Sequence, residues 1–168
     1  YTSIKVINMK KVLFVCTGNT CRSSMAEAMF KKLLEDNGVK DVEVSSAGTS
    51  VIFPLPASKN SIQVMKNQGI DISSHRSQPV TIEMLNKSDL ILTMTVRHRD
   101  WLMHLSPKAA DKVFTLKEFA YGVVGEGMYS SLDIVDPFGL SVEDYSQCAQ
   151  EIYKALEKVV EKIKKGEI

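Results

Sequence analysis

One short segment of the sequence carries the residue types that bind a phosphate group and attack its phosphorus atom. The segment, CTGNTCRSS at residues 16–24, sets Cys16 six residues before Arg22. A cysteine thiolate is a strong nucleophile, and the planar guanidinium of arginine binds two phosphate oxygens at once. Gly18 and Asn19 both tolerate positive φ angles, which help a tight loop to turn its N–H groups inward around an anion. The segment therefore predicts a nucleophilic cysteine beside a bound phosphate.

The elements expected on either side position this segment. The apolar run Val12–Val15 predicts a buried strand before it. From Ser23 onward, apolar residues recur at helical spacing, and Asn37-Gly38 ends the predicted helix. A helix N-terminus favours anions, because its first N–H groups are unpaired and its dipole is positive there. We therefore expect the pKa of Cys16 to be lowered and its thiolate to be abundant near neutral pH.

The spacing of cysteine and arginine is weak evidence when taken alone. The chain has only four arginines, however, and one of them falls at this place, with Gly-Asn inside the loop and Ser23 just beyond it. The alternative is a buried structural cysteine at the end of a strand, which needs none of these additions.

The remaining sequence alternates expected strands and helices. Further strands are predicted at Val42–Ser46, Leu90–Met94 and Lys112–Leu116, and further helices at Ser58–Gln68 and His98–Leu105. A mobile loop is expected from Gly122 to Asp136. The chain closes with a long amphipathic helix whose apolar stripe is Val142, Tyr145, Ala149, Ile152, Leu156, Val159 and Ile163.

This alternation predicts an α/β fold: a single domain with a four-stranded, parallel, twisted sheet and helices on both faces. Ligands of such sheets bind at the carboxyl ends of the strands, where Cys16 is expected. Met9-Lys10-Lys11 reads like a natural start, so residues 1–8 are interpreted as a leader and residues 9–168 as the domain.

Composition narrows the function classes. The formal net charge is +1, so no broad basic field predicts nucleic acid or an anionic membrane as a partner. Three cysteines do not resemble a secreted disulfide framework, and we expect a cytoplasmic monomer. The three histidines, His75, His98 and His104, have no ligand-like spacing, so we expect neither a metal site nor a cofactor.

The sequence resembles a known protein family. VCTGNTCRSSMAEA at residues 15–28 is similar to the signature C-x-G-N-x-C-R-S of the low-molecular-weight protein tyrosine phosphatases. The resemblance extends over nearly the whole chain from Lys10, through SSAGTS, GIDISSHRS, SDLILTMT and DIVDPFG.

The resemblance implies a role for each residue of the expected site. Cys16 would form a phospho-cysteine intermediate, Arg22 would bind its phosphate, and Asp136 would act first as general acid and then as general base. Asp133 is interpreted as a solvated loop residue. Ser23, Ser46 and His75 would hold Asn19 in its unusual conformation, and Ser23 would also donate a hydrogen bond to the thiolate. The remaining residues expected to contact phosphate or substrate are Thr17, Gly18, Thr20, Cys21 and Phe138.

Two interpretations of Cys21 remain open. It is either a resolving thiol that captures oxidised Cys16 as a reversible disulfide, or a small buried residue. Cys148 falls on the inward stripe of the last helix and is expected in the core.

Further motifs bear on which phosphorylated residue of a protein is the substrate. CTGNTCRS, DKVFTLKE and the Phe of DPFG resemble a bacterial branch of protein arginine phosphatases. Many tyrosine-specific members resemble one another in an aliphatic residue where this chain has Thr20. Asp136 can pair with a guanidinium, and Phe138 can stack on its plane. Phosphoarginine in proteins is thus the expected substrate, and phosphotyrosine is the alternative.

Two other functions are alternatives. An arsenate reductase of this fold needs a further thiol near the site, and Gly69–Leu85 contains no cysteine. A phosphopeptide-binding module without catalysis would keep the loop but has no need of both Cys16 and Asp136.

Overall fold

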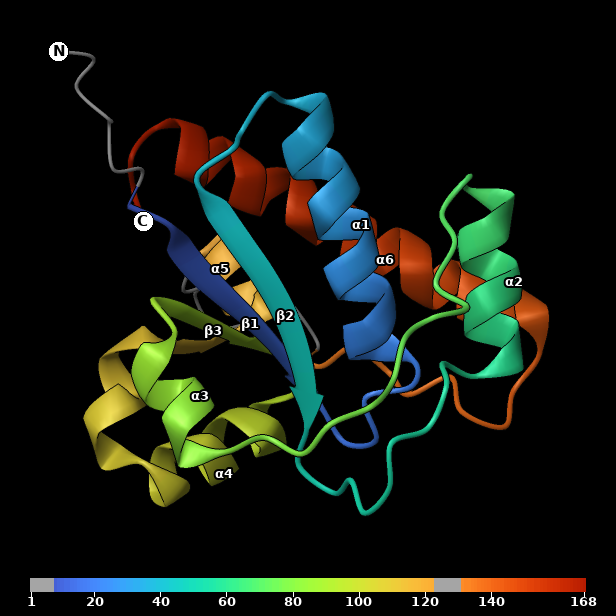
Figure 1. Ribbon diagram of the computed structural model, residues 1–168, viewed down its shortest axis with the longest axis horizontal. Coiled ribbons are helices and arrows are strands. Elements are labelled where there is room, and N and C mark those ends of the chain that lie inside the picture. The colour runs from blue at the N-terminus through green and yellow to red at the C-terminus, as the bar shows by residue number, and fades with distance from the viewer. Residues whose placement is uncertain (1–7, 123–130) are drawn as a thin grey trace, which may run out of the picture.

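Residues 8–122 and 131–168 are described by the computed structural model (Figure 1). Four parallel strands form one sheet in this part of the chain, in the order β2-β1-β3-β4. The strands are β1 (Lys10–Cys16), β2 (Val42–Gly48), β3 (Leu90–Thr93) and β4 (Val113–Thr115). The predicted four-stranded parallel sheet is confirmed.

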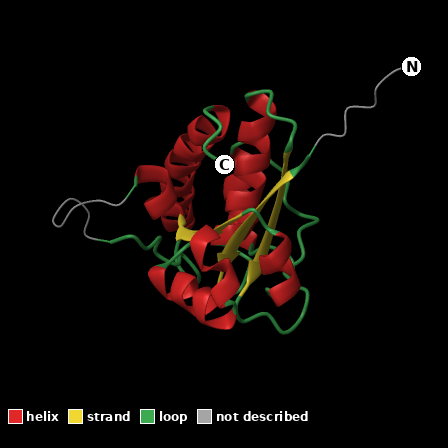
Figure 2. Ribbon diagram, turned by 90° about the vertical axis from the view of Figure 1, so that its left-hand side faces the viewer, coloured by secondary structure: helices red, strands yellow, loops and turns green. Residues whose placement is uncertain are grey.

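The helices cover both faces of this sheet, and Figure 2 shows the strands between them. They are α1 (Arg22–Asp36), α2 (Lys59–Asn67), α3 (Ile82–Lys87), α4 (Val96–Leu105), the 3₁₀ helix η1 (Pro107–Lys112), α5 (Leu116–Tyr121) and α6 (Val142–Lys164). None of the helices in the described ranges has the length and apolar character needed to cross a membrane.

Strand β1 lies between β2 and β3 and has apolar side chains on both faces, as its continuous apolar run predicts. Val12 and Phe14 belong to a core cluster that includes residues of α1 and α6, and the ring of Phe14 meets that of Phe30 edge to face at 5.4 Å between centroids. Leu13 and Val15 point the other way, into a second cluster with residues of α3, α4 and η1. This packing fixes the end of β1, and therefore Cys16, between two cores.

The carboxyl ends of the strands meet at one edge. Cys16 pairs with Gly48 at the end of β2, and the N–H of Met94 beyond β3 donates to the carbonyl of Val15 at 3.0 Å. The carbonyl of Met94 in turn accepts from the N–H of Ile134 at 2.8 Å. The segment before Asp136 is thereby tied to the edge that holds Cys16.

Several boundaries differ from the sequence predictions. The strand expected at Lys112–Leu116 is shorter, because Thr115 caps α5 in a capping box with Glu118. Helix α4 begins before His98, since Thr95 caps it by accepting from the His98 N–H. Helices α3 and α5 were not predicted. Val142 was wrongly placed on the buried stripe of α6, where it is 38% exposed in the first turn.

Two predictions fall partly on residues that are not described. Residues 1–7 of the expected leader lie outside the described residues, as do residues 123–130 of the loop expected to be mobile. Residues 131–136 of that loop contain no helix or strand.

Candidate active site

Cys16 ends β1 and begins the loop that leads into α1. Its side chain is buried, and its Sγ lies 2.8 Å from the Ser23 hydroxyl oxygen. The backbone N–H of Asn19 donates to the same sulfur at 3.3 Å. A strand end, a tight loop and the first turn of a helix thus surround the predicted nucleophile with donors that stabilise a thiolate.

Burial opposes that stabilisation. Desolvation raises the pKa of the Cys16 thiol above its ordinary value, while hydrogen bonds from Ser23, the charge of Arg22 and the Asn19 N–H lower it. The lowered pKa expected from the sequence was therefore wrong, because burial outweighs these contacts. Ser23 and Arg22 reduce this cost of burial and so favour formation of the thiolate.

Asn19 holds the loop in shape. Its φ angle is +56°, the left-handed region, and its side-chain amide donates to the hydroxyls of Ser23 at 2.8 Å and Ser46 at 2.9 Å. The Nε2 of His75 lies 2.7 Å from the Asn19 carbonyl oxygen, which accepts. Gly18 has no positive φ in this structure, so the sequence-based reason for its presence was wrong.

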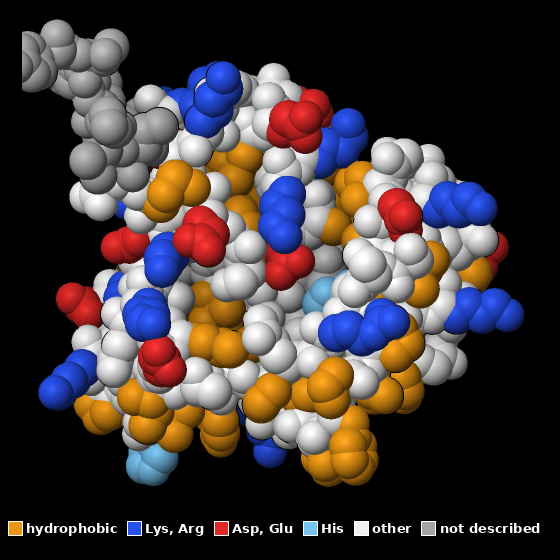
Figure 3. Space-filling view, in the orientation of Figure 1, with side chains coloured by type: hydrophobic (Ala, Val, Ile, Leu, Met, Phe, Trp, Pro, Cys, Tyr) orange, Lys and Arg blue, Asp and Glu red, His pale blue; other side chains and the backbone are white. Residues whose placement is uncertain are grey.

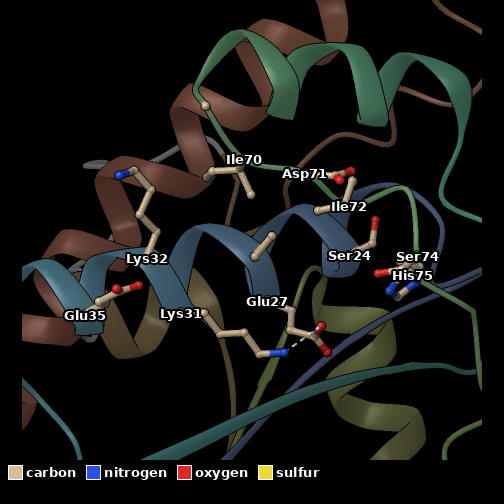
Figure 4. Close-up of a pocket in the computed structure, with 12 residues that line it drawn as sticks. Ser24, Glu27, Lys31, Lys32, Glu35, Ile70, Asp71, Ile72, Ser74 and His75 are labelled. Carbon is tan, nitrogen blue, oxygen red and sulfur yellow. Dashed lines mark hydrogen bonds and ion pairs between the residues drawn. The ribbon is translucent and has the colours of Figure 1, made fainter.

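Two residues that sequence reasoning missed complete this support. The backbone N–H of Gln78 donates to the Asn19 side-chain oxygen at 3.1 Å, and its own amide donates to the carbonyl of Ser46 at 2.9 Å. Glu27 of α1 accepts from the Ser46 hydroxyl at 3.1 Å. Glu27 and His75 also line a hollow of about 450 Å³ between α1 and residues 69–75 (Figure 4).

Gly48 was also missed, although the loop packs directly on it. A Cβ atom built there would lie 2.4 Å from the carbonyl oxygen of Thr17 and 3.1 Å from the backbone nitrogen of Asn19. Only glycine allows the loop to approach β2 this closely.

Substitution of Gly48 by alanine is expected to lower kcat/KM by roughly a hundredfold, the cost of moving a catalytic loop by about 1 Å. The measurement is steady-state turnover of p-nitrophenyl phosphate. Val51 also contacts this Cβ position, through its Cγ2 atom at 2.6 Å. The double variant Gly48→Ala with Val51→Ala relieves only that side-chain contact and should stay impaired. Recovery of activity in the double variant would show that the loop backbone is not the obstacle.

Arg22 and Asp136 both line the pocket over Cys16, and their charged groups face each other. Arg22 is 4% exposed, and its Nη1 donates to the carbonyl of Ile134 at 2.9 Å. Its Nη2 lies 3.5 Å from the carboxylate of Asp136, whose side chain is 50% exposed. Asp136 also accepts from the N–H of Phe138 at 3.1 Å. The structure therefore brings together Arg22, the residue predicted to bind phosphate, and Asp136, the predicted general acid.

Asp133, three residues earlier, has a structural contact and not the solvated position expected from the sequence. Its Oδ1 accepts from the N–H of Val96, the first residue of α4, at 2.8 Å. A carboxylate at this helix end stabilises the unpaired N–H groups. The sequence interpretation was wrong because the partner lies far away along the chain.

A pocket of about 200 Å³ opens over the loop and collects most of the predicted contact residues. It is lined by Cys16, Thr17, Gly18, Thr20, Cys21, Arg22, Asp136 and Phe138. Phe138 is 71% exposed at the mouth. Beside the loop, residues 52–55 expose Ile52, Phe53 and Leu55, and Figure 3 shows hydrophobic side chains gathered at this lower edge. The rim is apolar, while the buried guanidinium of Arg22 lies in the pocket wall.

The cysteines are unpaired and buried. Cys21 lies 3.3 Å from the Tyr145 hydroxyl and 3.4 Å from that of Ser58, contacts that fit a packed residue. Its role as a resolving thiol stays a prediction. Burial raises the pKa of Cys148 to about 12, in agreement with its expected place in the core.

His98 is a further residue that the sequence did not single out. Its Nε2 lies 2.8 Å from the Thr17 hydroxyl oxygen, and burial together with the charge of Arg22 lowers its pKa from 6.5 to about 4. The described residues contain no group of three or more His, Cys, Asp or Glu side chains arranged to hold a metal ion.

The lowered pKa of His98 predicts acid-dependent stability. Between about pH 6.5 and pH 4 the unfolded chain binds this proton more tightly, so stability is lost as the pH falls through that range. From pH 7 to pH 5 the contribution of His98 falls by about 2 kcal/mol. Urea unfolding of the wild type and of His98→Gln at both pH values measures it. Equal losses in the two proteins would contradict the prediction.

The chain belongs to the low molecular weight phosphotyrosine protein phosphatase family, whose model matches residues 11–167. The family and the phosphatase class expected from the sequence are confirmed. The protein-arginine-phosphatase of Bacillus subtilis is 38% identical over 157 residues, 92% of this chain and 97% of that protein.

Solved structures agree in fold. The YwlE arginine phosphatase from Geobacillus stearothermophilus has a TM-score of 0.82 and 37% identity, covering 94% of this chain and 94% of that one. The low molecular weight protein tyrosine phosphatase from T. tengcongensis has a TM-score of 0.82 and 42% identity, covering 91% of this chain and 99% of that one.

Proposed function

We propose that this phosphatase removes phosphate from phosphoarginine in proteins through a phospho-Cys16 intermediate. The Cys16 thiolate attacks phosphorus, an S–P bond forms, and the P–N bond to the guanidino nitrogen breaks. The nitrogen takes the electron pair of that bond together with a proton from the Asp136 carboxyl. Arg22 and the loop N–H groups stabilise the charge on the phosphoryl oxygens.

Water completes the reaction. Asp136, now a carboxylate, accepts a proton from the water that attacks phosphorus. The S–P bond breaks, and the sulfur leaves as a thiolate that accepts a hydrogen bond from Ser23, whose oxygen lies 2.8 Å away. Phosphate is released and Cys16 is restored. We propose that the working unit is a monomer and that it acts in the cytoplasm.

The hydroxyl of Thr20 in the pocket wall is the observation that carries the choice of phosphoarginine. It offers a hydrogen-bonding group to a leaving group rich in N–H donors, where an aliphatic side chain offers none. The exposed Asp136 carboxylate and the Phe138 ring at the mouth suit a planar cation. The similarity to arginine phosphatases supports the same choice, and the similarity to a tyrosine phosphatase keeps phosphotyrosine as the second candidate.

The test compares kcat/KM for one protein phosphorylated on arginine with that for one phosphorylated on tyrosine. We expect the wild type to prefer phosphoarginine, and Thr20→Ile to move this preference toward phosphotyrosine by roughly tenfold, the effect of one hydrogen bond. Thr20→Val separates shape from chemistry, because valine keeps the branched shape and loses the hydroxyl; it should behave like Thr20→Ile. A wild type that prefers phosphotyrosine, unchanged by either substitution, would overturn the proposal.

A further inference from the structure

One buried histidine beside the loop that joins β1 to α1 has an incomplete set of hydrogen bonds. His98 lies in the first turn of α4 and is 7% exposed. Its Nε2 is 2.8 Å from the hydroxyl oxygen of Thr17. Its other ring nitrogen, Nδ1, is buried and has no hydrogen-bond partner among the residues described.

The unpartnered nitrogen decides which tautomer the ring adopts. A neutral imidazole has one N–H donor and one acceptor nitrogen. If Nδ1 carried the proton, a buried N–H would be left without an acceptor, which is costly. If Nε2 carries it, the N–H donates to Thr17, and only a lone pair is left unpaired at Nδ1. The Nε2–H tautomer is therefore favoured, and Thr17 is the acceptor in this hydrogen bond.

A neutral ring is required for this assignment, and the surroundings provide it. Burial and the positive charge of Arg22 disfavour the imidazolium and keep the pKa of His98 at about 4. The carboxylates of Asp133 and Asp136 act against this shift of the pKa, and the smaller effect of Arg97 acts with it. His98 therefore remains a single-proton donor across the neutral pH range.

The tautomer of His98 determines where the hydroxyl proton of Thr17 can be donated. Thr17 is exposed and lines the pocket over Cys16. Because its oxygen accepts from His98, its own O–H is left to donate elsewhere, and phosphoryl oxygens are strong acceptors. We propose that His98 is a positioning residue that holds the Thr17 hydroxyl as a hydrogen-bond donor to the phosphoryl group in the pocket. This inference rests on the proposed function only in requiring that the loop binds a phosphoryl group.

The test is a double-mutant cycle read through inorganic phosphate, measured as a competitive inhibitor of p-nitrophenyl phosphate turnover. Thr17→Val and His98→Leu should each raise the Ki of phosphate by roughly tenfold, the lower range for a hydrogen bond to a charged group. The double variant should bind phosphate no more weakly than either single variant, since both remove one interaction. Thr17→Ser should recover most of the binding lost in Thr17→Val.

Further variants separate positioning from packing. His98→Gln keeps an amide N–H near the position of Nε2 and should recover phosphate binding relative to His98→Leu, whatever its melting temperature. His104→Leu, which changes an exposed histidine of the same helix, should leave Ki unchanged. If His98→Leu does not fold, His98→Asn replaces it, because its shorter amide does not reach Thr17. Additive effects in the cycle, or a wild-type Ki in both single variants, would overturn the proposal.

Inorganic phosphate has no leaving group, so this result does not depend on the phosphorylated residue. A wild type that prefers phosphotyrosine would overturn the choice of phosphoarginine and leave the role of His98 standing. A wild type that prefers phosphoarginine, combined with additive effects in the double-mutant cycle, would overturn the role of His98 and leave the choice of phosphoarginine standing.

Discussion

Replacement of Cys16 by serine is expected to lower kcat by at least about a thousandfold, the scale seen when a covalent nucleophile is removed. The serine hydroxyl is a poor nucleophile at neutral pH, and among the described residues no side chain within hydrogen-bond distance of Cys16 is a general base that would deprotonate it. Phosphate binding should survive, because Arg22 and the loop N–H groups remain. Initial rates with a phosphoarginine protein and the Ki of inorganic phosphate measure both effects.

Cys148→Ser is the matched control for this substitution. Cys148 is buried on α6, and its raised pKa of about 12 keeps it a thiol. We expect its replacement to leave kcat at the wild-type value. Full activity in Cys16→Ser, or equal losses in the two variants, would show that the reaction does not pass through Cys16.

Asp136→Asn is expected to lower kcat by roughly 10²- to 10⁴-fold, the contribution of general acid–base catalysis. Asparagine keeps the shape but has no proton to give to the leaving nitrogen and accepts none from water. The loss should be smaller in the first step with p-nitrophenyl phosphate, whose leaving group departs without protonation. Single-turnover rates with phosphoarginine and with p-nitrophenyl phosphate compare the two leaving groups directly.

The exposed residue Asp111 provides the control. Asp111→Asn removes the same charge from the molecule and is expected to leave both rates unchanged. Asp136 also faces Arg22 at 3.5 Å, so its loss changes the charge around the clamp. A fall of equal size for both leaving groups would assign Asp136 to phosphate binding and would contradict its role as the acid.

The sheet was predictable because its strands carry a strong local signal. Val12–Val15 and Leu90–Thr93 are continuous apolar runs, which suit strands buried on both faces. Helices α3 and α5 have six residues each, too few for a helical period to appear in the sequence. The exposure of Val142 depends on where the first turn of α6 lies on the molecule, which periodicity does not determine.

The candidate site also contains residues that the sequence predicted and residues that it did not. Cys16, Asn19, Arg22 and Ser23 lie within one segment, so their spacing could be read directly. Gly48, Gln78 and His98 reach the loop from other elements, and Glu27 contacts Ser46, which holds Asn19. Gly48 meets the loop because β1 and β2 pair in register, and His98 because α4 starts at the carboxyl edge of the sheet. These contacts depend on tertiary packing and have no signature in the local sequence.

The most direct measurement locates the phosphoryl group during turnover. A protein carrying phosphoarginine is mixed with equimolar enzyme, the reaction is stopped with denaturant at neutral pH, and peptides are mapped by mass spectrometry. The expected result is one phosphoryl group on the peptide that contains Cys16, more abundant when Asp136→Asn slows hydrolysis of the intermediate. Release of phosphate from phosphoarginine without any phosphorylated Cys16 peptide, in the wild type and in the variant, would contradict transfer through this cysteine.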